Sequence, residues 1–196
     1  MKTFRHYIYE LLQHIFHFAV WHTAPIQERE YAKHIAYKVG CLAADMPFDV
    51  VGGGYEIVEI GCGLGDIIAN INYPQGSKIG YDISPEAIRA ARFIHPQCKF
   101  DVGTFSDVAG HKIAILIAVN FLHAIEISEV ENMFNALLSK NDVRMIVVDQ
   151  VQNPPYQYLH DYVKLLGKFG YSLSSFRGFE AWKGSRRKVL YFKKCV

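Results

Sequence analysis

The amino-acid sequence predicts an α/β fold of three layers, in which an open, mostly parallel sheet lies between two layers of helices. Short apolar runs alternate with helix-like segments along most of the chain, and the runs at 113–119 (IAILIAV) and 144–149 (RMIVVD) are apolar almost throughout. Continuous apolar strands are typical of parallel sheets that are buried on both faces. With 196 residues, 51% of them hydrophobic, the chain has the length and composition of one globular domain.

The first 50 residues are predicted to be helical, in the segments 4–21 and 26–44, with Pro25 at the start of the second. Apolar residues of the first segment recur every three or four positions, which indicates an amphipathic helix packed on a domain. Attachment to a membrane surface is the alternative. No run of about 18 uncharged apolar residues occurs, so no transmembrane segment is expected. We expect residues 1–50 to form a lid over a site that residues 51–196 build.

From residue 55 onward the pattern changes to strands alternating with helices. The expected strands are 55–60, 78–82, 98–102, 112–119 and 144–149, followed by a closing antiparallel pair, 171–176 and 188–194. The expected helices run from a Ser84-Pro85 cap to about residue 95, from a Ser128–Glu131 capping box to about residue 138, and from the Pro154-Pro155 pair to about residue 170. Strands that alternate with helices in this way predict an open sheet with helices on both faces.

A glycine-rich loop, EIGCGLG at 59–65, follows the first strand and leads into an expected helix. Glycines allow positive φ and remove Cβ atoms, so that a ligand can lie against bare backbone. Doubly wound sheets bind their ligands at this edge, outside the carboxyl ends of the strands. The dinucleotide fingerprint would need a glycine at position 66, which is Asp66. A plain strand-to-helix turn is the alternative.

Asp82 ends the second strand, roughly 20 residues beyond the glycines, where an acid can accept both hydroxyls of a ribose. The alternative is that Asp82 only caps the helix that begins near Ser84. The loop, the strand and the spacing together favour the ribose.

These motifs resemble those of the class I S-adenosylmethionine-dependent methyltransferases. The resemblance covers about residues 55–196 and rests on EIGCGLG (59–65), YDISPEAIRAAR (81–92), AVNFLHAI (118–125) and the closing hairpin. It implies a Rossmann-like, doubly wound sheet of seven strands whose last strand is antiparallel. It also implies S-adenosylmethionine as the cofactor and S-adenosylhomocysteine as its product.

The resemblance further implies that Gly61, Gly63 and Gly65 face the methionine part of the cofactor and that Asp82 holds the ribose. The full set of expected cofactor contacts is Glu59, Gly61, Cys62, Gly63, Gly65, Asp82, Ile83, Thr104, Phe105 and Asn120.

Two positions depart from the family's pattern. After the third strand the family commonly has an acid that contacts the adenine amino group, and here Thr104 stands at that position, followed by Phe105. We therefore expect adenine to be recognised by Thr104, Phe105 and backbone groups, or by Asp101 if the register shifts. An acid expected at the start of the fourth strand is also absent from 111–113.

Three polar residues at the carboxyl ends of the fourth and fifth strands are candidates for chemistry: Asn120, His123 and Asp149. Histidine titrates near neutrality, so His123 is the candidate general base for a hydroxyl acceptor, and a structural role beneath the cofactor is the alternative. Asn120 is expected to hydrogen-bond the cofactor or the acceptor and not to carry the transferred proton, because an amide is not a base near neutral pH. Asp149 and Gln150 can join Asn120 at a divalent ion, but with a single carboxylate there we predict no metal site.

Two clusters elsewhere have alternative interpretations. His14 and His17 stand three residues apart on the first helix, yet no fourth zinc ligand is evident, so an exposed or cofactor-shielding helix face is expected. Arg186 and Arg187 precede the last strand and can clamp a phosphate or carboxylate of the acceptor. Charges that keep an edge strand soluble explain them equally well.

We expect a methyltransferase that acts on a small molecule or a glycan, at oxygen. The net charge of +2 gives no basic face for nucleic acid. The four cysteines stand far apart and form no disulfide pattern, which favours a reducing, cytoplasmic compartment. A non-catalytic S-adenosylmethionine-binding or assembly protein and a nucleotide-dependent oxidoreductase are the alternatives.

Overall fold

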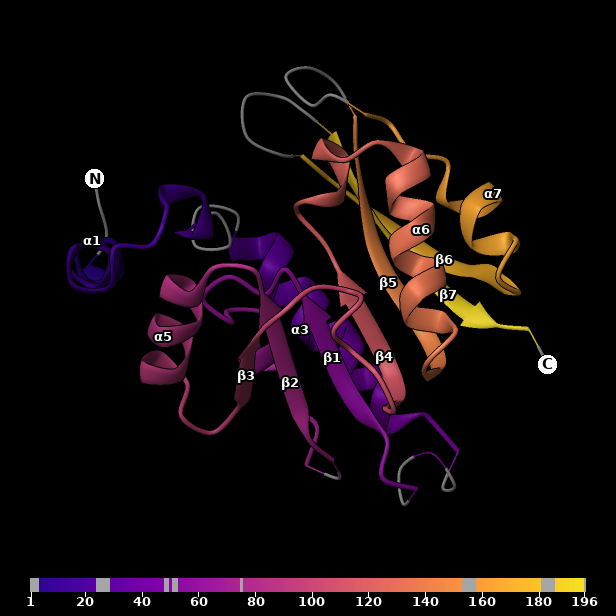
Figure 1. Ribbon diagram of the computed structural model, residues 1–196, viewed down its shortest axis with the longest axis horizontal. Coiled ribbons are helices and arrows are strands. Elements are labelled where there is room, and N and C mark those ends of the chain that lie inside the picture. The colour runs from indigo at the N-terminus through magenta and orange to yellow at the C-terminus, as the bar shows by residue number, and fades with distance from the viewer. Residues whose placement is uncertain are drawn as a thin grey trace.

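The computed structural model describes residues 4–23, 29–47, 50, 53–74, 76–152, 158–180 and 186–195. Its centre is a seven-stranded sheet with the strand order β3-β2-β1-β4-β5-β7-β6 (Figure 1). The strands are β1 (Glu56–Ile60), β2 (Lys78–Asp82), β3 (Lys99–Val102), β4 (Lys112–Ala118), β5 (Asp142–Gln152), β6 (Tyr171–Glu180) and β7 (Arg186–Lys194). Neighbours from β3 to β5 are parallel, and β7 is antiparallel to both β5 and β6. The predicted fold class, with its antiparallel last strand, is confirmed.

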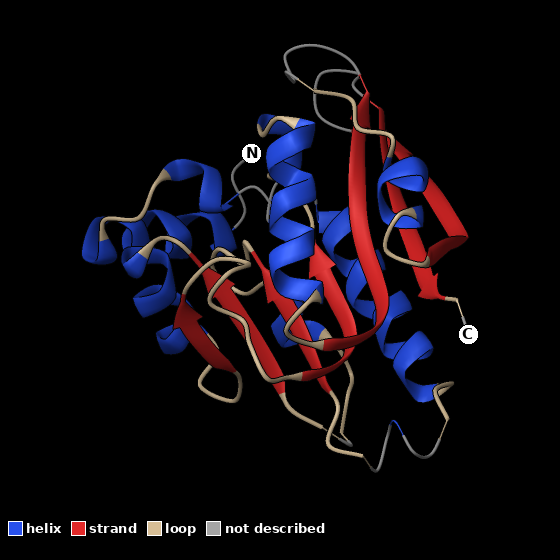
Figure 2. Cartoon of the chain, turned by 45° about the vertical axis from the view of Figure 1, so that its right-hand side comes forward, coloured by secondary structure: helices blue, strands red, loops and turns tan. Residues whose placement is uncertain are grey.

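Helices cover both faces of the sheet and make the three predicted layers. Helix α3 (Arg29–Ala44) lies on one face, while α6 (Ile127–Leu138) and α7 (Tyr162–Gly167) lie on the other (Figures 1 and 2). Each face has its own apolar core, with Ile35 of α3 in one and Phe134 of α6 in the other. The central strand β4 is buried on both faces from Ile113 to Ala118, as its continuous apolar sequence predicts.

Helix α1 (Phe4–Phe16) lies at one end of the molecule and packs on α5 (Pro85–Ile94), where the rings of Phe16 and Phe93 are 5.7 Å apart (Figure 1). The sequence predicted a helix as far as residue 21, but α1 ends at Phe16. His17 has a φ of 62°, a left-handed conformation that ends a helix, and a short 3-10 helix, η1 (Val20–Thr23), follows. Pro25 lies outside the described residues. Across the described part of the chain, no helix has both the length and the apolar character that crossing a bilayer requires.

The α-helix expected directly after the glycine loop is absent from the described residues 61–74, where turns and a three-residue 3-10 helix, η2 (Ile68–Asn70), stand instead. Side chains there bond the backbone groups that a longer helix would have paired. The Glu59 carboxylate accepts a hydrogen bond from the backbone amide of Ile68 at 2.9 Å. The side-chain amide of Asn70 donates one to the backbone carbonyl of Asp66 at 2.7 Å.

Two further boundaries differ from their predictions. The Ser128 capping box is wrong, because α6 begins at Ile127 with Glu126 as its N-cap and no side-chain cap, which leaves Ser128 inside the first turn. The start expected at Pro154-Pro155 lies outside the described residues. Helix α7 itself is short, and the Asp161 carboxylate caps it by accepting from the Lys164 amide at 3.0 Å.

Candidate active site

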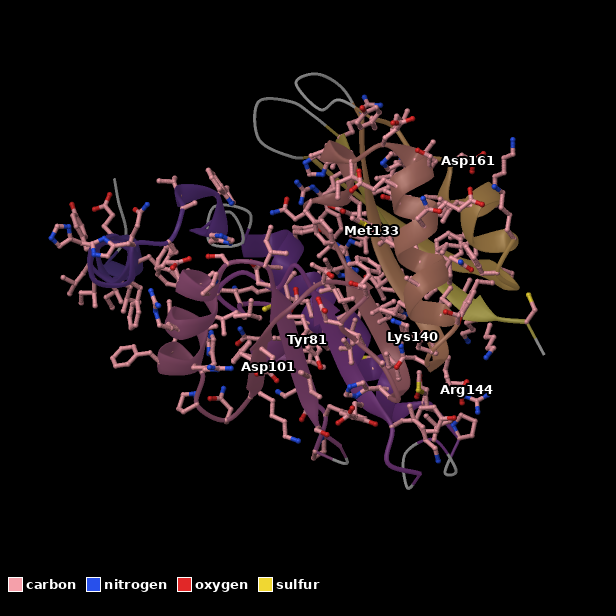
Figure 3. The ribbon with its side chains drawn as sticks, viewed as in Figure 1. Tyr81, Asp101, Met133, Lys140, Arg144 and Asp161 are labelled. Atoms are coloured by element: carbon pink, nitrogen blue, oxygen red, sulfur yellow. The ribbon has the colours of Figure 1, made fainter. Side chains whose placement is uncertain are left out.

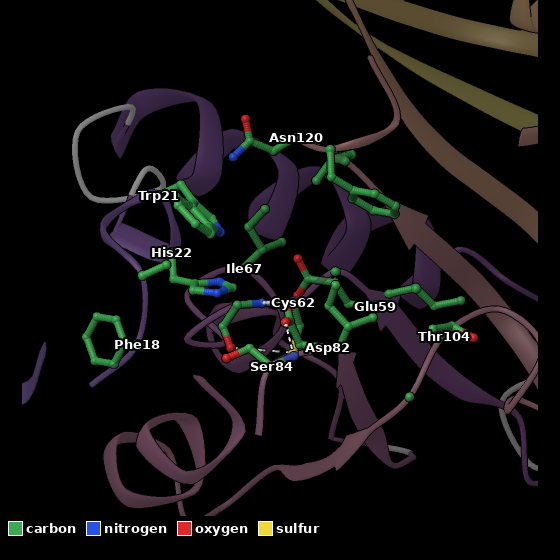
Figure 4. A pocket seen from close by; sticks show the side chains of 18 of the residues that line it. Phe18, Trp21, His22, Glu59, Cys62, Ile67, Asp82, Ser84, Thr104 and Asn120 are labelled. Atoms are coloured by element: carbon green, nitrogen blue, oxygen red, sulfur yellow. Dashed lines mark hydrogen bonds between the residues drawn. The ribbon is translucent and has the colours of Figure 1, made fainter. Parts of the chain in front are cut away.

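A cavity of about 660 Å³ opens at the carboxyl ends of β1, β2, β3 and β4 (Figure 4). Its size falls within the roughly 300–1,000 Å³ of small-ligand pockets. Loops that follow the four strands form most of its wall. The segment from His17 to η1 and single residues of α3, α5 and α6 contribute the remainder. The predicted site residues that line it are Glu59, Gly61, Cys62, Gly63, Asp82, Ile83, Thr104, Phe105, Asn120 and His123.

The glycine loop needs glycine for two separate reasons. Gly61, Gly63 and Gly65 all have left-handed φ angles, of 71°, 53° and 78°. A Cβ on Gly61 would lie 2.6 Å from the Phe121 ring, and a Cβ on Gly65 would lie 2.5 Å from the Phe100 ring. Gly65 packs in this way against β3 and does not line the cavity, unlike Gly61 and Gly63.

The Asp82 carboxylate holds the glycine loop against the start of α5. One oxygen accepts from the Gly63 amide at 2.8 Å and the other from the Ser84 amide at 2.9 Å. Ser84, and not Asp82, caps α5, since its hydroxyl accepts from the Ala87 amide at 3.1 Å. Each carboxylate oxygen has a second lone pair, so Asp82, which lines the cavity, can still accept ligand hydroxyls.

Two buried groups beside the loop are shifted towards their neutral forms. Burial raises the pKa of Glu59 well above its ordinary value, with the charges of Asp66 and Asp82 acting in the same direction. Burial likewise raises the pKa of the Cys62 thiol, so this side chain forms an uncharged part of the wall. Glu59 lines the cavity while it also braces η2 through the Ile68 amide.

The two alternatives for adenine recognition lie in different places. Thr104 lines the cavity, and both its hydroxyl and its amide donate to the Asp107 carboxylate, at 2.9 and 2.8 Å. Asp101, on β3 (Figure 3), forms an ion pair of 2.8 Å with Arg92 and does not line the cavity. Phe105 is buried, with its ring 5.2 Å from that of Phe134.

The loop after β4, residues 120–125, brings both candidate catalytic side chains to the cavity. Asn120 has a φ of 72°, unusual for a residue with a side chain. Its backbone amide donates a hydrogen bond to the Asp149 carboxylate at 2.8 Å. His123 lies in the 3-10 helix η3 (Leu122–Ala124). Burial lowers the pKa of His123, and although the Asp149 charge acts in the opposite direction, Arg187 and His160 lower it further. The net direction favours neutral imidazole.

Asp149 and Arg187 form a buried ion pair behind this loop, with 3.3 Å between Arg187 Nη1 and Asp149 Oδ2. The predicted acceptor clamp is therefore wrong for Arg187, whose side chain is only 2% exposed. The edge-strand interpretation is also wrong, because β7 lies between β5 and β6. The Gln150 amide donates to the His160 carbonyl at 2.6 Å. Among the described residues, no group of three His, Cys, Asp or Glu side chains is arranged to hold a metal.

The N-terminal region supplies aromatic and imidazole groups to the wall. Trp21 and His22 of η1 reach over the glycine loop (Figure 4), and Tyr31 of α3 also lines the cavity. Burial lowers the pKa of His22, and the Asp82 charge acts in the opposite direction. Tyr7 is 59% exposed and, like His14, does not line the cavity.

The sequence prediction missed several apolar residues of the wall. The described residues in this group are Phe18, Ala19, Ile60, Ile67, Val119, Phe121, Ile125 and Met133. Four of them carried a signal, because they lie within the motifs at 59–65 and 118–125: Ile60, Val119, Phe121 and Ile125. The others come from segments whose apolar residues equally suit an ordinary core.

Residues 52–153 match a protein-family model described as a methyltransferase domain, which spans just over half of the chain. The chain belongs to this family. The expected family, the enzyme class and S-adenosylmethionine as the cofactor are therefore confirmed.

Solved methyltransferase structures share the fold. One is magnesium protoporphyrin IX methyltransferase from Synechocystis PCC 6803, with bound S-adenosylmethionine, which is 19% identical to this chain with a TM-score of 0.70. The match covers 90% of this chain and 85% of that enzyme's chain. An S-adenosylmethionine-dependent methyltransferase from Clostridium acetobutylicum is 12% identical over 96% and 100%, with a TM-score of 0.66. A TehB-like methyltransferase from Corynebacterium glutamicum is 18% identical over 87% and 99%, with a TM-score of 0.56. No curated protein matches the sequence.

The cavity of this methyltransferase has the features that its cofactor needs. Gly61 and Gly63 leave backbone open to a ligand, and the Asp82 carboxylate keeps acceptor capacity for ribose hydroxyls. The aromatic and aliphatic wall suits a flat base and a methyl-bearing sulfonium, because a cation is attracted to aromatic faces. The residues present fit the cofactor.

Proposed function

We propose that this methyltransferase transfers the methyl group to a hydroxyl oxygen of an uncharged small molecule or glycan, with His123 as general base. The observation that carries the proposal is the position of His123. It lines the same cavity as Gly61, Gly63 and Asp82, and burial favours the neutral imidazole that a base needs. A neutral hydroxyl is the acceptor that needs such a base, because its proton must leave during transfer.

We assign the cofactor's parts to the wall as follows. Gly61 and Gly63 take the methionine part, Asp82 takes the ribose hydroxyls, and Thr104 with Phe105 takes the adenine. The support is that all five line one cavity, in the order that the strands β1, β2 and β3 impose. Asp101 is left out because its side chain pairs with Arg92 and lies outside the cavity. The remaining contacts proposed from the wall are Glu59, Cys62, Ile83 and Asn120.

The chain's own residues then have simple tasks. The bound cofactor supplies an electrophilic methyl group. His123 takes the proton of the acceptor hydroxyl on an imidazole nitrogen, and Asn120 orients the acceptor by hydrogen bonding. Phe18, Trp21 and Phe121 exclude water from the reacting groups.

The charge of the wall supports an uncharged acceptor. Among the described residues that line the cavity none is a lysine or an arginine, while Asp82 and Glu86 are acidic. Glu59 adds little negative charge, because burial raises its pKa. A phosphate or carboxylate acceptor would find no lysine or arginine there to pair with its charge. Because the cofactor and the acceptor share about 660 Å³, only a small molecule or the end of a glycan fits.

We further propose that the part of residues 1–50 that precedes helix α3 acts as a lid and that the protein is cytoplasmic. The lid is supported by Trp21 and His22, which reach the cavity from this part of the chain. The compartment is supported by the cysteines, all of which are free.

The test is to incubate the protein with S-adenosylmethionine labelled in its methyl group and a metabolite and oligosaccharide pool fractionated by charge. We expect label in the neutral fraction, and we expect it to survive mild alkali, as a methyl ether does. Label in the anionic fraction that alkali releases would indicate a carboxylate acceptor, and label in the cationic fraction would indicate nitrogen. Either result would overturn the proposal. In the same assay His123→Gln should transfer methyl more slowly than wild type. His14→Gln is its matched control and should keep the wild-type rate, because His14 is an exposed histidine outside the cavity.

A further inference from the structure

The carboxylate of Asp149 and the guanidinium of Arg187 form a charge pair in the interior that the proposed transfer does not use. Asp149 is fully buried and Arg187 is 2% exposed. Burying two charges costs free energy that their mutual attraction often fails to recover. Stability alone is therefore a weak reason for this pair, and its other contacts need to be considered.

The two oxygens of Asp149 hold two different elements of the cavity. One oxygen accepts a hydrogen bond from the backbone amide of Asn120 at 2.8 Å, and the other accepts one from the Tyr31 hydroxyl at 2.9 Å. Arg187 lies over the ring of the same tyrosine, with 4.5 Å between the guanidinium carbon and the ring centroid. Asn120 and Tyr31 line the cavity and Asp149 does not, so Asp149 acts on the reaction through these contacts or through its charge, and not by touching a ligand in the cavity.

The Asn120 contact also explains a strained backbone. A φ of 72° costs an asparagine free energy that something else must offset. The hydrogen bond from the Asn120 amide to a buried carboxylate is charge-assisted, and such bonds are about twice as strong as neutral ones. The loop continues from residue 120 directly into His123. This bond therefore also helps to fix the position of the backbone that carries the His123 imidazole.

The loop is held from a second side as well. The His160 ring nitrogen Nε2 bonds the Leu122 carbonyl at 2.9 Å, and the Tyr158 amide donates to the His123 carbonyl at 3.2 Å. A carbonyl only accepts, so the His160 nitrogen that faces it carries the proton. The loop that carries both candidate catalytic residues thus has fixed backbone contacts at positions 120, 122 and 123.

Electrostatics connects the same group to His123. The charges that act on this imidazole come from three places: Asp149 on β5, Arg187 on β7 and His160 in the segment after β5. Asp149 raises the pKa of His123, and Arg187 and His160 lower it. Burial and the Asp149 charge keep the pKa of Tyr31 well above its ordinary value, so its phenol stays protonated and remains a donor.

We propose that Asp149 is a positioning residue for methyl transfer, which holds Asn120 and helix α3 in fixed places through its two oxygens while Arg187 balances its charge. This rests on the proposed function. A docked α3 places Tyr31 in the wall, and a docked loop places Asn120 and His123. Helix α3 and the catalytic loop are thereby joined through one carboxylate.

Three variants test the proposal. Asp149→Asn keeps the shape but removes the charge and leaves Arg187 unbalanced, so Asp149→Asn/Arg187→Met is made beside it. Tyr31→Phe removes only the phenol hydroxyl that Asp149 accepts from. Its matched control is Tyr191→Phe, because Tyr191 is 1% exposed and its hydroxyl has no hydrogen-bond partner within the described part of the chain.

The first readout needs no acceptor. In NMR titrations of the free protein, we expect the Asp149 variants to move the amide resonance of Asn120 and to change the pKa of the His123 ring. The single Asp149→Asn variant should lower that pKa, because it removes the negative neighbour and keeps Arg187. An unmoved Asn120 resonance together with an unchanged His123 pKa would overturn the proposal.

The second readout is transfer of labelled methyl to the neutral pool. We expect Tyr31→Phe and the folded Asp149 variants to lower the rate about ten- to a hundredfold, the range that a small misplacement of reacting groups gives. Affinity for S-adenosylhomocysteine, measured by calorimetry, should change much less than the rate, because Asn120 is the one proposed cofactor contact that Asp149 holds. Tyr191→Phe should change neither the rate nor the affinity. If wild-type protein transfers methyl and these variants transfer it equally well, the positioning role fails. If the NMR changes occur but wild type methylates only charged acceptors, the proposed function fails and the positioning of the loop stands.

Discussion

Asp82 combines a structural and a proposed binding role in one carboxylate. Its oxygens hold the amides of Gly63 and Ser84, so the glycine loop and the start of α5 are fixed before any ligand binds. A binding group held in this way loses little conformational entropy when the ligand arrives. The same contacts mean that a variant must be judged by both its fold and its affinity.

Replacing Asp82 should weaken cofactor binding strongly. Two charge-assisted hydrogen bonds to ribose hydroxyls are worth about 1.5–3 kcal/mol each, so Asp82→Ala should lower the affinity for S-adenosylhomocysteine at least about a hundredfold by calorimetry. Asp101→Ala is the control, since Asp101 is an exposed acid paired with Arg92 outside the cavity. Unchanged affinity in a folded Asp82→Ala protein, or a loss in Asp101→Ala, would contradict the assignment.

His123 should give the transfer rate an acidic limb. Its pKa is lowered by burial, so the imidazole stays neutral until the pH falls below the ordinary value of about 6.5. As the pH falls further, protonation removes the base and the rate declines. His123→Gln should lower the rate by about 10²–10⁴ and abolish this limb, measured as rate against pH with a neutral acceptor. A variant that retains the wild-type pH profile would leave His123 with a structural role.

At the scale of elements, the glycine loop joins β1 to the rest of the site through close packing. Gly65 lies against Phe100 of β3, so the loop packs on that strand and also lines the cavity through Gly61 and Gly63. Gly110 offers a comparison, because it has nearly the same φ, 79° against 78°, with nothing within 4 Å of an added Cβ.

This pair separates backbone strain from steric clash. Gly110→Ala should lower the free energy of unfolding by about 1–2 kcal/mol, the cost of a left-handed residue with a Cβ. Gly65→Ala should lose about 1–3 kcal/mol more, because its Cβ would lie 2.5 Å from the Phe100 ring. Chemical denaturation measures both. Equal losses in the two variants would mean that the loop tolerates the extra methyl group.

The η1 segment should behave as a lid. Trp21 is 73% exposed although it lines the cavity, which indicates that this short element is held by few contacts in the free protein. Amides at 20–23 should exchange quickly with solvent and slow down when S-adenosylhomocysteine is added, whereas amides of β4 should be slow in both states. Exchange at 20–23 that the ligand leaves unchanged would show that η1 is fixed scaffold.

At the scale of the whole molecule, the sheet could be predicted because strands that are buried on both faces have continuous apolar sequences. The continuous apolar runs of β4 and β5 carry that signal, and the glycine loop and Asp82 carry the signal for the ligand edge. These are local patterns, and each is complete within a few residues of sequence.

The rest depends on contacts between distant parts of the chain. Tyr31 and Asp149 are 118 residues apart, and no local pattern announces their hydrogen bond. Arg187 looked like a surface cation because its burial depends on β7 lying inside the sheet. The prediction of a helix after the glycine loop failed for a related reason, since the side chains of Glu59 and Asn70 bond the backbone of that segment.

The central claim is that one cavity, at the carboxyl ends of β1 to β4, presents the cofactor to His123 and Asn120. A crystal structure of the protein with S-adenosylhomocysteine tests it most directly. We expect the ribose hydroxyls on Asp82, the methionine part against Gly61 and Gly63, and the sulfur directed into the space that His123 and Asn120 face. A ligand bound elsewhere, or one whose sulfur faces away from these two side chains, would contradict the account.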